Sequence, residues 1–294
     1  MEKQHPWRML LFLLMSTDTV LLKLVEYRSD NGQRGSLGCP GAAFITGRSV
    51  SVVKSITVLE VSFDYAGNSN VIFPVILRDE NELILVDCGY PGFLPLIRSA
   101  AEKKGIDIGR LTKIIITHHD FDHMGALAEF KREYPRMQVL ASIDDAKYIS
   151  GREKSLRLQQ AEAIYDKLPE DQKEGAKAFQ RVLELVETVE VDQILRDGDW
   201  FPWCGGMEIV STPGHMPGHI SIYLSESKAL IGGDALVVEE NALAIANPQY
   251  TLDMVGARNS VKKLLGYAID QIICYHGGVF TKNIQESLQK IGSL

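Results

Sequence analysis

The stretch Thr117-His118-His119-Asp120-Phe121-Asp122-His123-Met124-Gly125 decides the fold, and it directly follows the apolar run Lys113-Ile-Ile-Ile116. The β-branched run predicts a buried strand that ends at the first histidine. Because alternate side chains of an extended chain share a face, we expect His118 and Asp120 to point together and His119 to point away. Four potential ligands within six residues, at the end of such a strand, indicate metal binding rather than packing.

Three later segments contribute further candidate ligands. His215 lies in Ser211-Thr-Pro-Gly-His-Met-Pro-Gly-His219, where proline and glycine favour a rigid loop. Asp234 follows two glycines at the end of the apolar strand 229–231, and His276 ends the predicted strand 271–275. Each segment is a weak signal alone, but together and in this order they predict a two-metal site. Its expected ligands are His118, Asp120, Asp122, His123, His215, Asp234 and His276.

The ordered series Asp87, His118-x-Asp120-x-Asp122-His123, His215, Asp234 and His276 resembles the motifs of the metallo-β-lactamase superfamily. The resemblance covers about residues 53 to 294 and is closest to small stand-alone bacterial hydrolases near the lactonase and glyoxalase II branches. It implies one metal on His118, Asp120 and His215 and a second on Asp122, His123 and His276. It further implies that Asp234 bridges the two metals and that Asp87 has a structural role.

Asp120 departs from the commonest family pattern, which has histidine at this position. A carboxylate makes the site richer in oxygen and favours harder ions such as Mn or Fe(II) relative to zinc. The expected cofactor is therefore two divalent ions, either zinc or Mn/Fe.

The pattern from residue 53 onward predicts an α/β fold. Strands come first in a run and are later interleaved with helices, which predicts two packed sheets with helices outside, a four-layer αββα sandwich of the metallo-β-lactamase type. The expected strands are 56–63, 71–77, 83–87, 113–117, 207–211, 219–224, 228–232 and 271–275. The expected helices are 92–104, 124–133, 154–167, 170–188 and 252–266.

The segment 150–190 is expected to be a helical insertion in the domain 53–294. Apolar residues at helical spacing suit a hairpin that packs one face on the core. A cap that shapes the substrate pocket over the active site fits the same pattern equally well, since long insertions between metal motifs are natural places for lids.

Residues 1–52 are expected to be a poorly ordered N-terminal extension that contributes no ligand. Arg8 and the apolar run 9–15 resemble the start of a signal peptide, but no small-residue cleavage pattern follows, and the run is too short to span a bilayer. A cytoplasmic location is therefore favoured over export. His5 is the one histidine of the chain that lies outside the metal motifs.

The overall charge and the cysteines narrow the partners. A formal net charge of -7 gives no general attraction to phosphate backbones, so a small-molecule substrate is favoured, with no nucleic-acid and no membrane partner. Four cysteines, Cys39, Cys88, Cys204 and Cys274, lie far apart and form no C-x-x-C pair, which indicates buried free thiols.

The expected activity is hydrolysis by a metal-bridged hydroxide. Two divalent ions lower the pKa of a bridging water towards roughly 7, and the hydroxide attacks an ester, lactone or thioester carbonyl. Asp122, His219 and Tyr250 are the candidate catalytic residues. His219 is a candidate for orienting a metal ligand, and the alternative is that it is a histidine at the start of a strand with no role in the site. Tyr250 is a candidate oxyanion donor, although a loop aromatic that packs on the core is the commoner role.

Two other functions stay open. One is an iron-dependent oxidoreductase of the same fold, and the other is a metal-binding regulatory module with little turnover.

Overall fold

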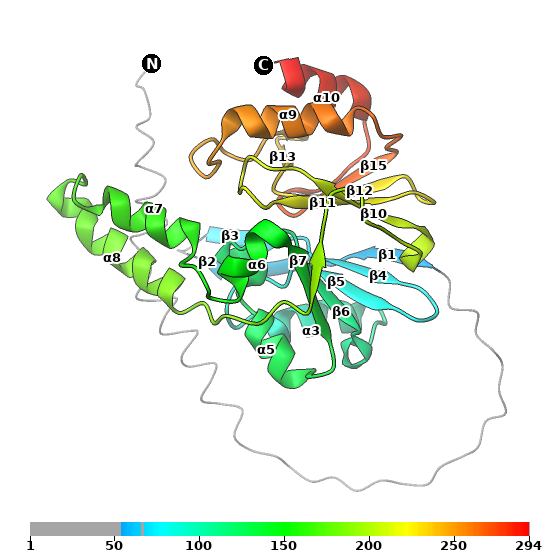
Figure 1. The fold of residues 1–294 in the computed structure, drawn as a ribbon, viewed down its shortest axis with the longest axis horizontal. Helices are drawn as coiled ribbons and strands as arrows, with labels where there is room; N and C mark the ends of the chain where they lie inside the picture. Colours follow the sequence, from blue (N-terminus) through cyan, green and yellow to red (C-terminus); the bar gives the residue numbers. More distant parts are fainter. Residues whose placement is uncertain (1–53, 66–67, 294) are drawn as a thin grey trace, which may run out of the picture.

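Apolar side chains on both faces of the central strands set the layering of the fold. The computed structural model describes residues 54–65 and 68–293. Ile114 and Ile116 pack outward into a core shared with the first helices, whereas Ile115 packs inward against the second sheet. A third core lies between the second sheet and the last helices. The predicted four-layer α/β sandwich is confirmed: two sheets lie face to face, with α3 and α5 outside one and α9 and α10 outside the other (Figure 1).

The first sheet holds the early strands and is parallel on the side that carries the histidine motif. Its order is β1 (Ser55–Val58), β4 (Val75–Arg78), β5 (Leu83–Val86), β6 (Lys113–Ile116), β7 (Gln138–Ser142), β8 (Gln193–Leu195). The strands from β5 to β8 run parallel to one another.

The second sheet holds the later strands, with one parallel pair, β12 and β15, at its centre. Its order is β16 (Gly278–Phe280), β15 (Gln271–Cys274), β12 (Ala229–Gly233), β11 (Ile220–Leu224), β10 (Met207–Ser211), β9 (Trp200–Phe201). Two small hairpins complete the strands, β2 (Val61–Tyr65) with β3 (Asn68–Ile72) and β13 (Val237–Glu239) with β14 (Ala242–Ala244).

The helices cover the outer faces and form one projecting pair. They are α3 (Leu94–Lys103), α4 (Phe121–Met124), α5 (Leu127–Glu133), α6 (Ile143–Ile149), α7 (Leu156–Tyr165), α8 (Glu170–Glu184), α9 (Met254–Leu264) and α10 (Ile284–Ser293). The pair α7 and α8 projects from the side of the sandwich near β2 and β3 (Figure 1).

Several predicted elements are divided in the structure. The expected strand 56–63 is two strands, because β1 pairs with β4 while β2 turns away to pair with β3. The expected strand 71–77 breaks at Pro74, which cannot donate a ladder hydrogen bond. The expected helix 124–133 is interrupted at Gly125, where the chain packs so closely that an added Cβ would lie 2.3 Å from the Phe121 carbonyl oxygen.

Other elements were not predicted from the sequence. They are β7, β8, β9, α6, the hairpin of β13 and β14, β16, and α10. A signal for α10 was present, since Ile284, Leu288 and Ile291 recur at helical spacing and are buried in the third core.

Candidate metal centre

The carboxyl ends of the parallel strands deliver most of the predicted ligands to one place. His118 and Asp120 follow β6, Asp234 follows β12, and His276 follows β15. In open α/β sheets this end of the strands is where ligands gather. The loop that carries His215 is tied to the first sheet, because Ser142 Oγ donates a 2.6 Å hydrogen bond to the carbonyl of Gly218.

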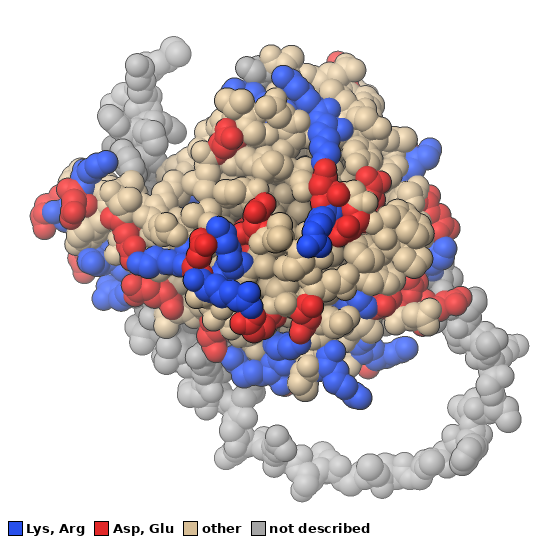
Figure 2. Space-filling view, viewed as in Figure 1, with Lys and Arg blue, Asp and Glu red and all other residues tan. Residues whose placement is uncertain are grey.

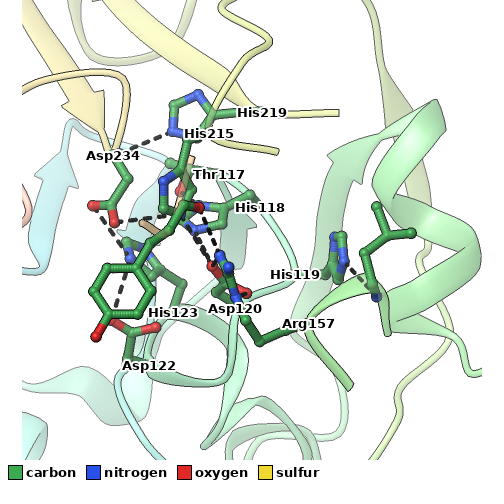
Figure 3. A network of polar contacts seen from close by, with 12 residues as sticks. Thr117, His118, His119, Asp120, Asp122, His123, Arg157, His215, His219 and Asp234 are labelled. Carbon is green, nitrogen blue, oxygen red and sulfur yellow. Dashed lines mark hydrogen bonds and ion pairs between the residues drawn. The ribbon is translucent and has the colours of Figure 1, made fainter. Parts of the chain in front are cut away.

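The structure brings His118, Asp120 and His215 into one group whose ligand atoms all lie within 4.8 Å of one another. Asp120 Oδ2 lies 3.0 Å from His215 Nε2 and 3.6 Å from His118 Nε2 (Figure 3). Atoms held about 2.1 Å from a shared tetrahedral ion are about 3.4 Å apart, so these separations suit a metal.

A second group holds Asp122, His123 and His276. Asp122 Oδ2 lies 3.2 Å from His276 Nε2 and 3.7 Å from His123 Nε2. Asp234 lies between the groups: its Oδ1 is 3.4 Å from His123 Nε2, and its Oδ2 is 3.7 Å from His215 Nε2. All seven predicted ligands therefore lie together, and His118, His123 and Asp234 form a third group that overlaps the other two.

A hydrogen-bond chain through Asp87 fixes the orientation of two histidine rings. Thr117 Oγ1 donates to Asp87 Oδ2 over 2.8 Å and so accepts from His118 Nδ1 at 3.1 Å. His123 Nδ1 donates to the same Asp87 oxygen over 2.9 Å. With each Nδ1 carrying the proton, both Nε2 lone pairs point into the centre, as a metal ligand requires.

His219 lies behind the ligands rather than among them. The backbone N–H of Asp234 donates to His219 Nε2 over 2.9 Å, so the ring proton is on Nδ1, which donates to Thr212 Oγ1 at 2.8 Å. Thr212 continues to Ser221, whose hydroxyl donates to the Gly232 carbonyl. Burial lowers the pKa of His219 to about 3, which keeps the ring neutral. His219 therefore holds the backbone at Asp234 in place, and it does not line the cavity described below.

The residues present fit a divalent cation. His118 Nε2, His123 Nε2 and Asp234 Oδ1 are buried and have no hydrogen-bond partner, although buried polar atoms normally have one. Burial alone would lower the pKa of His123, but the carboxylates around it, Asp234 first, outweigh burial and raise that pKa well above its ordinary value. The cluster thus attracts positive charge, which a metal ion supplies.

Arg157 was missed in the sequence and is part of this centre. It comes from α7, and both oxygens of Asp120 accept from it, Oδ1 from Nε at 3.1 Å and Oδ2 from Nη2 at 2.6 Å (Figure 3). Nη2 also donates to the Tyr250 carbonyl, and Nη1 donates to Gln160. Burial would raise the pKa of Asp120, but the Arg157 charge and the neighbouring histidines outweigh it and hold that pKa well below its ordinary value.

A signal for Arg157 existed in the sequence. It shares the apolar face of α7 with Ala161 and Ile164, at spacings of four and seven residues. A basic residue on the face of a helix that packs inward needs a buried partner. The sequence does not say which carboxylate that partner is.

His119 points away from the ligands and has a different role. Its Nδ1 pairs with the buried Asp145, and its Nε2 accepts the Leu156 N–H at 3.3 Å, at the start of α7. The ring also stacks on Tyr148, with 4.3 Å between centroids. His119 therefore anchors the start of the helix that carries Arg157.

A cavity of about 390 Å³ opens beside the metal ligands. The residues that line it include the ligands Asp120, Asp122 and His276 as well as Arg157 and Tyr250. The insertion is a helical pair with its own small core, formed by Leu158, Ala161 and Leu183, and it also supplies Arg157 and Phe179 to the cavity. The insertion thus packs as a hairpin and shapes the pocket.

The remaining expectations concern the surface and the cysteines. Cys88, Cys204 and Cys274 are free and buried, while Cys39, His5 and the extension 1–52 lie outside the described residues. On the face in view, basic and acidic side chains are interleaved (Figure 2). Within residues 54–65 and 68–293, helices of the length and apolar character needed to cross a membrane are absent.

Comparisons with known proteins agree with this geometry. The family model for the metallo-beta-lactamase superfamily matches residues 66–276. A probable metallo-hydrolase, YflN of Bacillus subtilis, is 26% identical over 240 residues, which are 76% of this chain and 87% of that protein. A hydroxyacylglutathione hydrolase of Rhodopseudomonas palustris is 26% identical over 164 residues, and the chain spans about half of its length (48%).

A solved structure shows the same fold. The metallo-beta-lactamase family protein TTHA1429 of Thermus thermophilus aligns with a TM-score of 0.63 at 20% identity. The alignment covers 81% of this chain and 78% of that one.

Proposed function

The chain belongs to the metallo-β-lactamase superfamily, and from that premise we propose that it is a hydrolase that uses two divalent metal ions to cleave an ester, lactone or thioester. One observation carries the proposal. His118 Nε2, His123 Nε2 and Asp234 Oδ1 are buried without a hydrogen-bond partner, and they belong to groups of histidine and aspartate side chains whose ligand atoms lie within 4.8 Å of one another. Such a set of nitrogen and oxygen donors fits a divalent ion and little else.

Divalent ions held by these residues would supply hydroxide at neutral pH and would polarise a carbonyl oxygen. The side chains provide the rest. Asp122 is the most exposed carboxylate of the ligand groups, at 14% against 8% for Asp234 and 6% for Asp120. It also lines the cavity, so it is placed to hold a proton for the leaving atom.

Tyr250 is the proposed donor to the developing oxyanion. Its ring lies on the cavity wall, and its backbone carbonyl is held by Arg157 Nη2 at 3.0 Å. The Arg157 guanidinium carbon lies 5.7 Å from the centre of that ring. These contacts hold the backbone and the ring of Tyr250 beside the centre, and a donor whose position is fixed in advance is what oxyanion stabilisation needs.

The balance of nitrogen and oxygen donors narrows the choice of metal ion. The centre has four histidines and three carboxylates, so zinc, manganese and iron(II) all suit it. Because Arg157 neutralises Asp120, the group of Asp120 is less anionic than its residue types suggest. This neutralisation moves the balance back towards zinc.

The test combines metal content with a substrate panel on one purified sample. We expect divalent metal and hydrolysis of at least one of a thioester, a lactone and an aryl ester, with less cleavage of a phosphodiester. Asp122→Asn should lower kcat by about 10²–10⁴-fold, as loss of a general acid or base does. The exposed Trp200→Ala is the matched control and should leave kcat unchanged.

Other outcomes would identify the alternatives. Iron with oxygen consumption and no hydrolysis identifies an oxidoreductase. Tight metal binding with no turnover of the panel identifies a regulatory module.

A further inference from the structure

We propose that the substrate is an uncharged acyl compound whose apolar acyl group lies on an aromatic wall beside the metal ligands. This inference rests on the proposed hydrolase function and names the substrate class. It comes from the aromatic residues that line the cavity together with the metal ligands.

Four aromatic rings form that wall. Phe63 and Tyr90 have centroids 5.2 Å apart, as do Tyr90 and Phe121, and Phe121 lies 5.8 Å from Phe179. The rings come from β2, the loop after β5, α4 and α8, so segments distant in the sequence build one continuous surface. All four line the cavity and are half-buried, so each ring is partly exposed there.

The wall adjoins the reacting groups directly. Phe121 lies between Asp120 and Asp122 in the sequence, so the row of rings meets the metal ligands at Phe121, between Tyr90 and Phe179. Val71, on β3, extends the apolar surface and is 36% exposed. A carbonyl placed at the ligands therefore has an apolar surface for the group attached to it, and covering that surface removes apolar area from water.

The charges of the cavity argue against an anionic substrate. Among the described residues that line it, Arg157 is the only lysine or arginine. Asp120, Gln160 and the Tyr250 carbonyl accept four of its five N–H groups, and the Asp120 carboxylate balances its charge, so Arg157 offers a second carboxylate a single Nη1 N–H at most. Glu239 lies at the exposed rim and repels anions. A thioester of glutathione, which carries two carboxylates, therefore finds no cationic side chain without a carboxylate partner among the described residues that line the cavity.

The experiment measures kcat/KM for uncharged thioesters of one thiol, with acyl chains from acetyl to octanoyl. Each methylene that reaches the wall should raise kcat/KM by about fourfold. Phe179→Ala should lower kcat/KM for the octanoyl thioester by about tenfold and leave the acetyl thioester nearly unchanged. Tyr165→Ala is the matched control, because Tyr165 is a half-buried aromatic of the same helical pair that does not line the cavity.

A flat chain-length series would overturn the proposal, and so would a glutathione thioester that reacts faster than an uncharged thioester of the same acyl group. Binding of alcohols from ethanol to octanol, followed by thermal shift, separates this proposal from the proposed function. Chain-length-dependent alcohol binding that Phe179→Ala weakens, with no hydrolysis of any carbonyl compound, would support the wall and refute the hydrolase. Hydrolysis whose rate does not depend on chain length would support the hydrolase and refute the aromatic wall.

Discussion

Replacing Arg157 by methionine tests how far the buried Asp120 carboxylate depends on the guanidinium. Both side chains are 6% exposed, and two Arg157 nitrogens lie 3.1 and 2.6 Å from the two Asp120 oxygens. Removing one partner of a buried ion pair costs about 3–5 kcal/mol, because the other charge is left buried without compensation. At about 2–4 °C per kcal/mol for a domain of this size, the thermal midpoint of the metal-free protein should fall by about 6–20 °C.

The assay is thermal unfolding followed by circular dichroism, first with EDTA and then with excess Zn²⁺. An ion bound by His118, Asp120 and His215 places positive charge beside the same carboxylate, so the gap between variant and wild type should narrow with Zn²⁺. Arg157→Lys is the matched control: it keeps the charge but loses the two-point contact, and its loss should be smaller.

A double variant isolates the pair from the other contacts of Arg157. Arg157→Met with Asp120→Asn removes both charges, so it should recover much of the stability lost in Arg157→Met alone. The reasoning is refuted if Arg157→Met lowers the stability of the metal-free protein by less than about 1 kcal/mol, the range of an exposed ion pair. The reasoning is also refuted if the stability losses of Arg157→Met and Asp120→Asn simply add in the double variant.

The ion pair between Arg157 and Asp120 also changes the effect on metal binding that we expect from Asp120→His. From the sequence, histidine at this position is expected to restore a more zinc-like site with one extra positive charge. In the structure that substitution also leaves the Arg157 charge without its carboxylate partner, beside the residues that would hold the divalent ions. We therefore expect Asp120→His to bind Zn²⁺ well only together with Arg157→Met, as isothermal titration calorimetry of the metal-free proteins can show.

The remaining predictions concern which residues bind the metal, whether the N-terminal extension is needed, how stability changes at low pH, and whether the buried thiols react. Asp120→Ala should lower the amount of Zn²⁺ bound per chain and reduce hydrolysis by orders of magnitude. His119→Ala should lower thermal stability yet keep the metal, because His119 contacts Asp145 and the start of α7. The opposite pattern would place His119 among the ligands. A protein that begins near Val53 should fold and bind metal, and an insoluble or metal-free product would make the extension part of the domain. Burial alone would raise the pKa of Asp79, but hydrogen bonds from the backbone N–H groups of Cys204, Asn81 and Glu82 outweigh burial and lower that pKa. The ionised Asp79 therefore stabilises the folded protein above about pH 3.9, and this contribution is lost as the pH falls through the pKa of the folded state. Urea unfolding should then show wild type and Asp79→Asn converging at low pH. Burial raises the pKa of Cys204 to about 12, so iodoacetamide at neutral pH should label it, and the two other buried thiols, only after unfolding, as mass spectrometry can follow.

Properties that depend on neighbours along the chain were predictable from the sequence. The alternation of Ile114, Ile115 and Ile116 indicates a strand buried on both faces, and the structure places these side chains in two different cores. The same alternation separates His118 and Asp120 from His119. The ligand motifs likewise follow predicted strands, and in the structure the carboxyl end of β6 in the first sheet meets those of β12 and β15 in the second.

The boundaries of elements were less predictable, because partner strands decide them. The apolar run 56–63 reads as one strand, but β1 and β2 pair with different partners in different sheets. Hydrophobic alternation is the same in both halves, so nothing in the run marks the change of direction.

Only the tertiary structure decided the charge of the centre and the shape of its pocket. Asp120 and Arg157 are 37 residues apart, and the helical pair must dock on the sandwich before their charges meet. The same docking brings Phe179 next to Phe121 and completes the aromatic wall. Hydrophobic patterning acts between neighbours along a strand or helix, so one sequence reveals it, whereas the pairing of a buried charge depends on which distant segment packs against it.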